Sequence, residues 1–433
     1  MRPSAYELFS PITMQRVEQH YEGEYRSLKS GGFFESATRS LITRPAIGSR
    51  ATMVGNLSYR TIMQSMPRQT TTAAAGFVDP RVSFSRLVLQ RFKEDPLVPK
   101  PFHRIPISLE AYHAPPPTFQ ECPKEVWDGS TEERLCTNTR PTSSDTVANQ
   151  CFQSMRRVDT FFQTAYSTVA VEEPIHGNLM RVDIHDPEAF NNAFWQPSDI
   201  RVHCGDVDSS VFGQPLAGNP EVIVHEFGHA VTYYSSNLDY MRQSGAINES
   251  LSDVFAITEK QHQAGVRAGA ADASWNIGEH LIAGAAAGDS LRSMSHPGTG
   301  FRGHSIIGDD DQVGLMSEYH GDQEPVDRAH DYGGVHKYSG IGNHAFYLAA
   351  IRDGGPSWER MGKIWHLALK MSQHDASFFD FARETIKASK DLGFGEPIAH
   401  IVAKAWSDVG VLSCLSGGVA LEVPQQESEG WCW

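Results

Sequence analysis

The chain has 433 residues, 40% of them hydrophobic and 21% charged, which is typical of a soluble globular protein and too long for one small core. The formal net charge of −15 argues against a general nucleic-acid-binding protein. No stretch approaches about eighteen consecutive apolar residues, so the sequence predicts no membrane span.

The first hundred residues differ in charge from the rest. They contain 14 Lys and Arg against 8 Asp and Glu, whereas the remainder contains 23 against 44. Residues 36–78 carry five arginines and no acid. Three interpretations are open: a solvated extension, a pro-segment that lies on an acidic domain, or an organelle transit sequence. The acids Glu7 and Glu18 argue against transit, and the N-terminus lacks the apolar stretch of an ordinary secretory signal.

A boundary is expected near residue 95. Residues 69–76 are low in complexity and predict a linker, and a proline-rich stretch follows from Pro96. Residues 100–215 then alternate short apolar runs with turn residues, which predicts strands and loops, with one helix near 150–167.

The rest of the chain has helical periodicity. Asn219 as N-cap and Pro220 at the first helical position predict a helix start. Apolar residues recur at helical spacing in 361–371, 378–392 and 398–411. The tail after Cys414 is expected to be loosely ordered.

Six cysteines are present, and none forms a C-x-x-C pair, which argues against a zinc ribbon or a thioredoxin motif. The even number is compatible with disulfides in an oxidising compartment, and reduced buried thiols are equally compatible. The six are Cys122, Cys136, Cys151, Cys204, Cys414 and Cys432.

Two histidines four residues apart enclose a glutamate in the segment HEFGH, residues 225–229. On a helix, His225 and His229 lie on one face within reach of one ion, and imidazole nitrogens suit Zn²⁺. Glu226 points roughly 100° away, so we expect it to contact a metal-bound water rather than the metal. Taken alone, this motif is also compatible with an ordinary helix whose histidines form hydrogen bonds and bind no metal.

A second helical segment, GAINESLSDVFAI at 245–257, strengthens the metal interpretation. Its Glu249 and Asp253 lie on one helix face, where two carboxylates repel each other. A site in which Glu249 binds zinc and Asp253 accepts the N–H of His225 relieves both charges. Zinc-bound histidines usually have such an outer partner.

HEFGHAVT followed by SGAINESLSDVF resembles the thermolysin-like zinc metallopeptidases, which place a glutamate ligand 19 residues after H-E-x-x-H, the spacing found here. The resemblance implies an α+β fold of two domains, β-rich and then helical, with the active site in the cleft. The short precursor resembles the protealysin-like branch. The implied division is a basic extension or pro-segment at 1–95, a β-rich domain with the zinc helix at 96–234, a helical domain at 235–415 and a tail at 416–433.

The resemblance also assigns roles to residues. His225, His229 and Glu249 are expected to hold one catalytic Zn²⁺, with Asp253 behind His225. Glu226 is expected to be the general base. The implied oxyanion-stabilising residues are Tyr240 and His336, and Asp331 orients His336.

Substrate contacts follow from two further motifs. NNAFW implies that Asn192 and Ala193 pair with the substrate backbone, and GDSLRSM implies that Arg292 holds a substrate carbonyl. An apolar pocket for the residue after the cleaved bond is implied for Val222, Ile277, Leu281 and Leu291. This pocket predicts a preference for Leu, Phe or Ile, whereas simple core packing is the alternative.

The sequence departs from the family at two places. Gly228 replaces a usual threonine, and we expect a less rigid zinc helix with activity retained. Lys260 and Ser274 take two acidic positions of the family's calcium site, so the double site is not expected to be complete. We hypothesise that Lys260 neutralises Glu279 as a salt-bridge substitute. The acids that remain in this region are Glu221 and Glu279, with Glu259 and Asp272 nearby.

The sequence therefore predicts a zinc metalloendopeptidase, made as a zymogen, that hydrolyses protein or peptide substrates by zinc-activated water. A monomer without a nucleic-acid partner is expected. An exopeptidase and a binding protein on a peptidase scaffold are the rivals, and the presence of Glu226 and all ligands disfavours the scaffold. The resemblance implies an extracellular enzyme, whereas the N-terminus leaves the cytoplasm or an organelle open.

Overall fold

The computed structural model describes residues 6–8, 10, 13–17, 19–20, 109–113, 121–172, 177–415 and 418–419. The chain divides into two compact units, residues 1–12 with 97–433, and residues 13–96. The second unit is described only at 13–17 and 19–20, which are helical. The expected linker at 69–76, the arginine-rich stretch at 36–78 and most of the tail lie outside the described residues.

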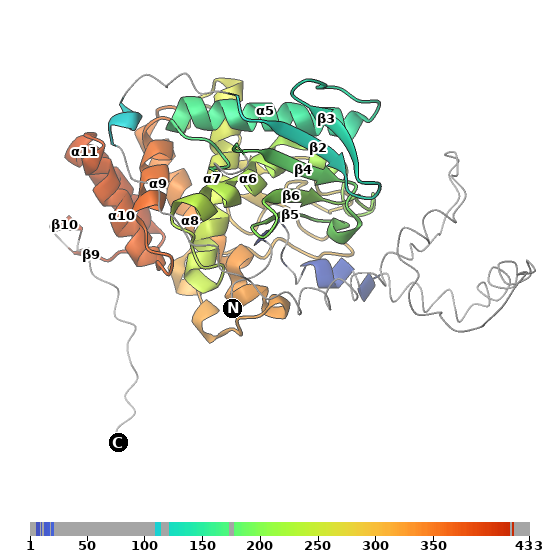
Figure 1. Cartoon of the computed structure of the whole chain (residues 1–433). Coiled ribbons are helices and arrows are strands. Elements are labelled where there is room, and N and C mark those ends of the chain that lie inside the picture. The colour runs from blue at the N-terminus through green and yellow to red at the C-terminus, as the bar shows by residue number, and fades with distance from the viewer. Residues whose placement is uncertain are drawn as a thin grey trace, which may run out of the picture. The chain divides into compact units, whose positions relative to one another are not determined.

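A six-stranded mixed sheet in the order β1-β5-β6-β4-β2-β3 forms one side of the first unit (Figure 1). Strands β2, β4 and β6 run parallel, and their buried valines Val126, Val182 and Val202 lie in register, which gives the sheet an apolar face. The strands are β1 Tyr6–Glu7, β2 Lys124–Asp128, β3 Glu133–Thr137, β4 Met180–Ile184, β5 Ala193–Gln196 and β6 Arg201–Cys204.

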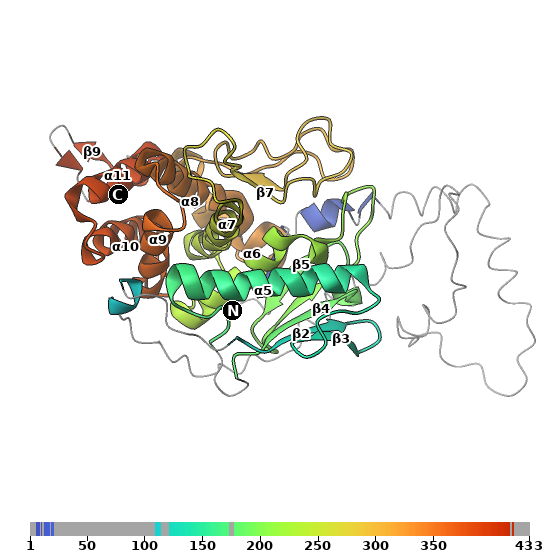
Figure 2. The same ribbon diagram turned by 90° about the horizontal axis from the view of Figure 1, so that it is seen from above.

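Helix α5, Thr146–Tyr166, runs along this sheet (Figure 2). The side chain of Asp145 caps its first turn by accepting from the N–H of Ala148 at 2.8 Å. Its buried residues recur at helical spacing, among them Phe152, Met155 and Phe162, so one stripe of the helix faces the core. The helix expected near 150–167 is therefore present.

The remaining helices gather beside α5 and the sheet, away from strand β3 (Figure 1). The zinc-motif helix α6 begins as expected, with the Asn219 side chain accepting from the N–H groups of Glu221 and Val222. It packs between β5, α5 and α7, and nearly all of its residues are buried. These helices are α6 Pro220–Ser235, α7 Arg242–Ala264, α8 Asp331–Asp353, α9 Arg360–Met371, α10 Phe378–Asp391 and α11 Gly395–Asp408.

The α+β fold with a mixed sheet followed by helices confirms the predicted fold class. Two short strand pairs complete it, β7 Asn276–Ile277 with β8 Arg292–Ser293, and β9 Cys414–Leu415 with β10 Gly418–Val419. The short 3₁₀ helices are η2 Glu110–Tyr112, η4 Pro187–Ala189, η5 Leu216–Gly218, η6 Met316–Glu318, η7 Gly321–Gln323 and η8 Arg328–His330.

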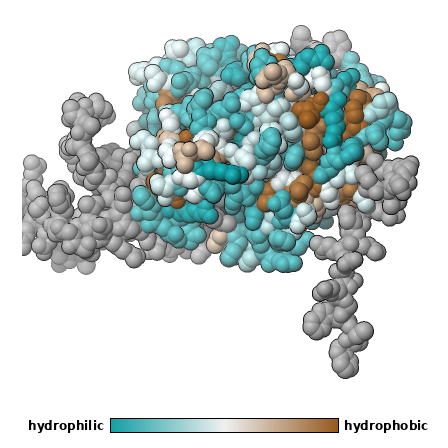
Figure 3. All heavy atoms as spheres, turned by 180° about the vertical axis from the view of Figure 1, so that it is seen from behind, coloured by the Kyte–Doolittle hydropathy of each residue, from teal (hydrophilic) through white to brown (hydrophobic). Residues whose placement is uncertain are grey.

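The surface seen from behind is largely hydrophilic, with an apolar area towards one side (Figure 3). Three large hydrophobic side chains in the described part of the chain are classed as exposed, namely Leu109, Leu315 and Val326. Among the described helices, none has the length and apolar character needed to cross a bilayer.

Candidate active site

Helices α6 and α7 bring three candidate ligands together in the core. His225 and His229 stand one turn apart on α6, and Glu249 faces them from α7. The Nε2 atoms of the two histidines are 3.2 Å apart, and each lies 3.4 Å from a Glu249 oxygen. All three side chains are almost completely buried.

This geometry fits a zinc ion. Ligand atoms about 2.1 Å from a tetrahedral zinc lie about 3.4 Å from one another, which matches the separations found here. The donor set of two imidazoles and one carboxylate is one that catalytic zinc sites use, and it leaves a fourth position open. Oε2 of Glu249 is buried without a hydrogen-bond partner of ordinary geometry, as a ligand oxygen would be.

Each histidine is oriented from behind through its Nδ1 atom. His225 Nδ1 lies 2.9 Å from Asp253 Oδ1, and His229 Nδ1 lies 2.9 Å from Asn248 Oδ1. These contacts leave Nε2 of both rings facing Glu249. Asn248 was not among the predicted site residues, although it directly precedes Glu249 in the motif.

Asp253 is the centre of a larger buried network. Arg292 donates to both of its oxygens at 2.8 and 2.7 Å, and Asn343 Nδ2 donates at 2.8 Å. Burial opposes the charge of Asp253, but Arg292 and His225 outweigh it and hold the pKa of this carboxyl well below its usual range. Asn343, on α8, is a second residue that the sequence did not reveal.

Glu226 occupies an unusual position for a carboxylate. It is completely buried, and neither oxygen has a hydrogen-bond partner of ordinary geometry in the described residues. Burial raises its pKa to about 8. A buried polar group without a partner is costly, and such groups occur where function requires them.

His336 and Tyr240 lie next to Glu249. His336 Nδ1 lies 2.6 Å from Asp331 Oδ1, and its Nε2 lies 3.6 Å from Glu249 and 3.4 Å from the Tyr240 hydroxyl. The Tyr240 hydroxyl donates to Glu249. Both side chains are therefore beside Glu249, one of the three candidate metal ligands.

The start of α8 explains how Asp331 reaches His336. Asp331, Tyr332, Gly333 and Gly334 all have left-handed backbone, with φ of 53°, 51°, 87° and 77°. A Cβ on Gly334 would lie 2.5 Å from the Tyr338 ring, so this turn needs glycine both for its φ and for its space. The turn allows Asp331 to bond both the side chain and the N–H of His336.

The predicted substrate contacts lie along β5 and β8, where the N-terminal strand is bound. Glu7 pairs with Phe194 in antiparallel register. The N–H of Leu8 donates to the carbonyl of Ala193 at 2.8 Å, and Arg292 Nη1 donates to the carbonyl of Leu8 at 3.1 Å. Leu8 is completely buried. Asn192 directly precedes β5, and its side chain accepts from the N–H of Ala193.

Three of the predicted pocket residues lie around one turn. The N–H of Leu281 donates to the carbonyl of Gly278, and that of Leu291 donates to the carbonyl of Ile277. A Cβ on Gly278 would lie 2.6 Å from Leu281 and 3.1 Å from Leu291. Val222, on α6, is also buried, and its neighbour Glu221 accepts from the N–H of Gly278.

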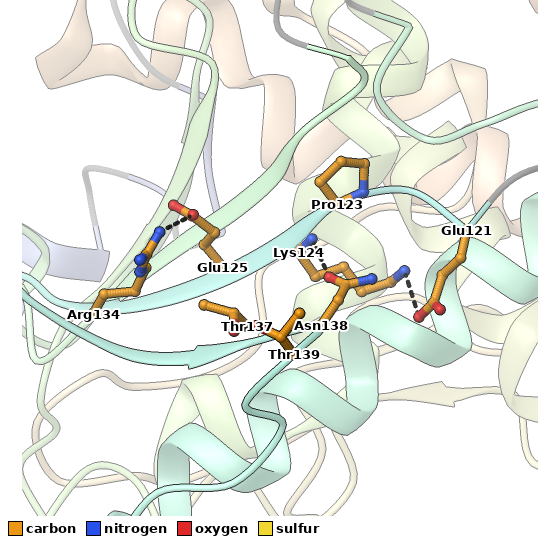
Figure 4. Close-up of a pocket in the computed structure, with 8 residues that line it drawn as sticks. All are labelled: Glu121, Pro123, Lys124, Glu125, Arg134, Thr137, Asn138 and Thr139. Carbon is orange, nitrogen blue, oxygen red and sulfur yellow. Dashed lines mark hydrogen bonds and ion pairs between the residues drawn. The ribbon is translucent and has the colours of Figure 1, made fainter.

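Two other features of the described residues look less suited to catalysis. Asp183, Asp186 and His203 lie close enough to hold an ion, but Asp183 is paired with two arginines and His203 with Asp186 and Asp199. A shallow pocket beside β2 and β3 is lined by four charged and four uncharged residues, and among the charged ones Arg134 pairs with Glu125 at 2.7 Å and Lys124 with Glu121 at 3.4 Å (Figure 4).

Four cysteines whose side chains are described form no disulfide and are buried, namely Cys122, Cys136, Cys151 and Cys204. Burial raises the pKa of all four thiols, so they are unreactive packing residues.

A mixed sheet, a long buried H-E-x-x-H helix and a glutamate ligand on the next helix define a zinc metallopeptidase of the thermolysin class. Comparison with known proteins agrees. The family model for the thermolysin metallopeptidase catalytic domain matches residues 129–233, and that for its alpha-helical domain matches residues 236–411.

Relatives cover the same region. An extracellular metalloprotease of Pectobacterium carotovorum subsp. carotovorum is 37% identical over 274 residues, which are 63% of this chain and 75% of the relative. Protease PrtS of Photorhabdus sp. (strain Az29) is 33% identical over 273 residues, 63% of this chain and 70% of that protein. The solved precursor of protealysin, a metalloproteinase from Serratia proteamaculans, is similar with a TM-score of 0.61 and 33% identity, covering 69% of this chain and 90% of that one.

The chain therefore belongs to the thermolysin metallopeptidase family and is a zinc metalloendopeptidase.

Proposed function

We propose that this enzyme cleaves internal peptide bonds before bulky apolar residues, with Glu226 as the general base. The observation that carries the proposal is the completely buried Glu226 carboxylate, which has no side-chain hydrogen-bond partner of ordinary geometry in the described residues and is adjacent in sequence to a member of a three-residue candidate metal set. Such a carboxylate is available to a water molecule that attacks a substrate carbonyl.

A zinc ion held by His225, His229 and Glu249 would polarise the substrate carbonyl and lower the pKa of a water molecule towards about 7. Glu226 takes the proton as this water attacks, and it then returns the proton to the amine of the leaving product. Asp253 and Asn248 hold the two imidazoles in the tautomer that offers Nε2 to the metal.

His336 and Tyr240 stabilise the negative charge that develops on the carbonyl oxygen. The His336 ring bonds Asp331 through Nδ1, which leaves Nε2 facing the Tyr240 hydroxyl and Glu249, and Nε2 donates to the carbonyl oxygen when it carries a proton. The Tyr240 hydroxyl donates its one proton to Glu249 in this structure, and it would turn this proton to the carbonyl oxygen once Glu249 binds the metal.

The substrate backbone is proposed to pair with β5 at Asn192 and Ala193 and to offer a carbonyl to Arg292. The hydrogen bonds that Leu8 makes to Ala193 and Arg292 support this, because they are those an extended peptide would make. Val222, Ile277, Leu281 and Leu291 form the apolar pocket, so a Leu or Phe after the cleaved bond is favoured.

We also propose that residues 1–95 act as a pro-segment. Strand β1 takes the edge of β5 on which a substrate would pair, and Leu8 is bound to Arg292, so both contacts would have to be released before cleavage. The likeness to a solved protealysin precursor supports the proposal. The relative named as an extracellular metalloprotease supports secretion, with the cytoplasm and an organelle as the alternatives.

The proposal is tested with an internally quenched, end-blocked peptide that has Leu after the scissile bond. We expect cleavage at that bond, loss of cleavage with a zinc chelator, recovery on adding zinc, and about one zinc per chain. The same peptide with Asp in place of Leu is the control for the pocket.

Two results would contradict the proposal. Cleavage of free aminoacyl substrates but not of the blocked peptide would indicate an exopeptidase. Bound zinc without cleavage, also after removal of the N-terminal segment, would indicate a binding protein on a peptidase scaffold.

A further inference from the structure

Lys260 joins three segments near the candidate active site. Its Nζ lies 2.9 Å from Glu221 at the start of α6, 2.6 Å from Glu279 and 3.0 Å from the carbonyl oxygen of Asn276. Lys260 itself is on α7, eleven residues after Glu249. The hypothesised pair with Glu279 is thus present, and the ammonium has two further oxygen partners.

The carboxylate oxygens of Glu221 and Glu279 that do not face Lys260 also accept hydrogen bonds. Glu221 Oε2 accepts from the N–H of Gly278 at 2.6 Å, and Glu279 Oε1 accepts from the Ser274 hydroxyl at 2.9 Å. The three N–H donors of an ammonium match the three oxygens around it. The cluster is therefore a complete arrangement of donors and acceptors around one positive charge.

The same residues do not fit a calcium ion. Calcium takes six to eight oxygen ligands at about 2.3–2.6 Å, and here the ammonium occupies the centre of the oxygens. Glu259 is buried and bonds Arg157 with both oxygens, at 2.9 and 2.8 Å. Asp272 is exposed. Of these four acids, Glu221, Glu279 and Glu259 are therefore already paired with a cationic side chain.

We propose that the Lys260 ammonium replaces the calcium ion that thermolysin-family enzymes commonly bind, and that this chain keeps its fold around the zinc helix without calcium. A tethered cation supplies the positive charge between Glu221 and Glu279 at every calcium concentration. It also fastens the first turn of α6 to the 274–279 loop, which carries Ile277. Lys260 is in this sense a positioning residue for the metal-binding helices.

Thermal unfolding of the full-length, zinc-loaded chain tests the proposal independently of peptidase activity. The melting temperature is measured in buffer freed of calcium, with zinc restored, and again with about 5 mM calcium, which exceeds the dissociation constants of weak extracellular calcium sites. We expect the two melting temperatures to agree within about 1 °C, because the Lys260 ammonium already occupies the position among these oxygens.

Two variants test the role of the charge. Lys260→Met keeps most of the length of the side chain but leaves two carboxylates without their cation, so we expect the melting temperature to fall by roughly 5 °C or more. Without calcium, the melting temperature of Lys260→Glu should fall by as much. With calcium, this variant should regain at least about half of the loss, since the glutamate restores an oxygen ligand. Lys387→Met, which removes an exposed lysine paired with Asp391, is the matched control and should change by less than about 1 °C.

A wild-type chain that melts several degrees higher with calcium would overturn the proposal, and so would a Lys260→Met chain that melts like the wild type. If calcium does not raise the melting temperature of Lys260→Glu, the proposal that Lys260 takes the place of a calcium ion in this cluster is contradicted. If Lys260→Met does not fold, the calcium comparison on the wild type still decides the matter.

Discussion

Removing the Leu8 side chain should release the enzyme from its own N-terminal strand. Leu8 directly follows strand β1. Its side chain is completely buried, its N–H bonds Ala193 and its carbonyl bonds Arg292. Leu8→Ala keeps both backbone hydrogen bonds and removes only the buried apolar contact.

The size of the effect follows from that burial. Truncating a fully buried Leu to Ala costs about 3 kcal/mol, at the lower end of the range for protein cores. Since about 1.4 kcal/mol corresponds to a factor of ten, the fraction of molecules with β5 and Arg292 free should rise about 100-fold. The Leu8→Ala substitution changes none of the three candidate metal ligands.

The assay is the initial rate on the quenched peptide, with the intact mass of the chain checked before and after. We expect Leu8→Ala to be about 100-fold more active than the uncleaved wild type. Leu315→Ala is the control, because it makes the same change at a side chain that is 42% exposed, and it should leave the rate unchanged. Equal rates for the uncleaved wild type and Leu8→Ala would refute the reasoning.

Three further outcomes follow from the site and its surroundings. Asn248→Ala removes the acceptor behind His229 and should weaken zinc binding by roughly 10- to 100-fold in a chelator competition, whereas unchanged affinity would show that this bond does not matter. Gly228→Ala should lower the free energy of unfolding by about 1–3 kcal/mol, because a Cβ there lies 2.9 Å from Ser252 Cα, and the clash outweighs the better helix propensity of alanine. Gly269→Ala, with open space around it, is the control for denaturant unfolding. Burial alone would lower the pKa of His203, but Asp186 and Asp199 raise it to about 9, so its contribution to stability is present below about pH 6.5 and is lost as the pH rises through about 9. Unfolding free energies of the wild type should therefore fall over that range by more than those of His203→Gln, and parallel curves would contradict this.

The approach of the three candidate zinc ligands could be predicted because the two histidines depend on local periodicity and the glutamate on the spacing that the family resemblance implies. His225 and His229 share a helix face by their spacing alone, and Glu249 follows on the next helix. The helix start at Asn219 was equally local, since its side chain caps two N–H groups directly after it. Such features need no knowledge of long-range contacts.

Long-range partners could not be predicted from one sequence. Strand β1 has only two residues and therefore no periodicity that the sequence could reveal. It pairs with β5, which lies far along the chain, so that Tyr6 is opposite Trp195. Asn343 reaches Asp253 across 90 positions. The role of Gly228 was also hidden, because it depends on how closely Ser252 of α7 approaches α6.

The measurement that tests the central claim most directly is the zinc content and turnover of Glu226→Gln. This change keeps the size of the side chain and removes only its ability to accept a proton, and Glu226 is not among the three ligands. We predict about one zinc per chain, an unchanged melting temperature and a turnover at least about 1,000-fold below that of the wild type. Turnover close to that of the wild type, with zinc bound, would show that Glu226 is not the base.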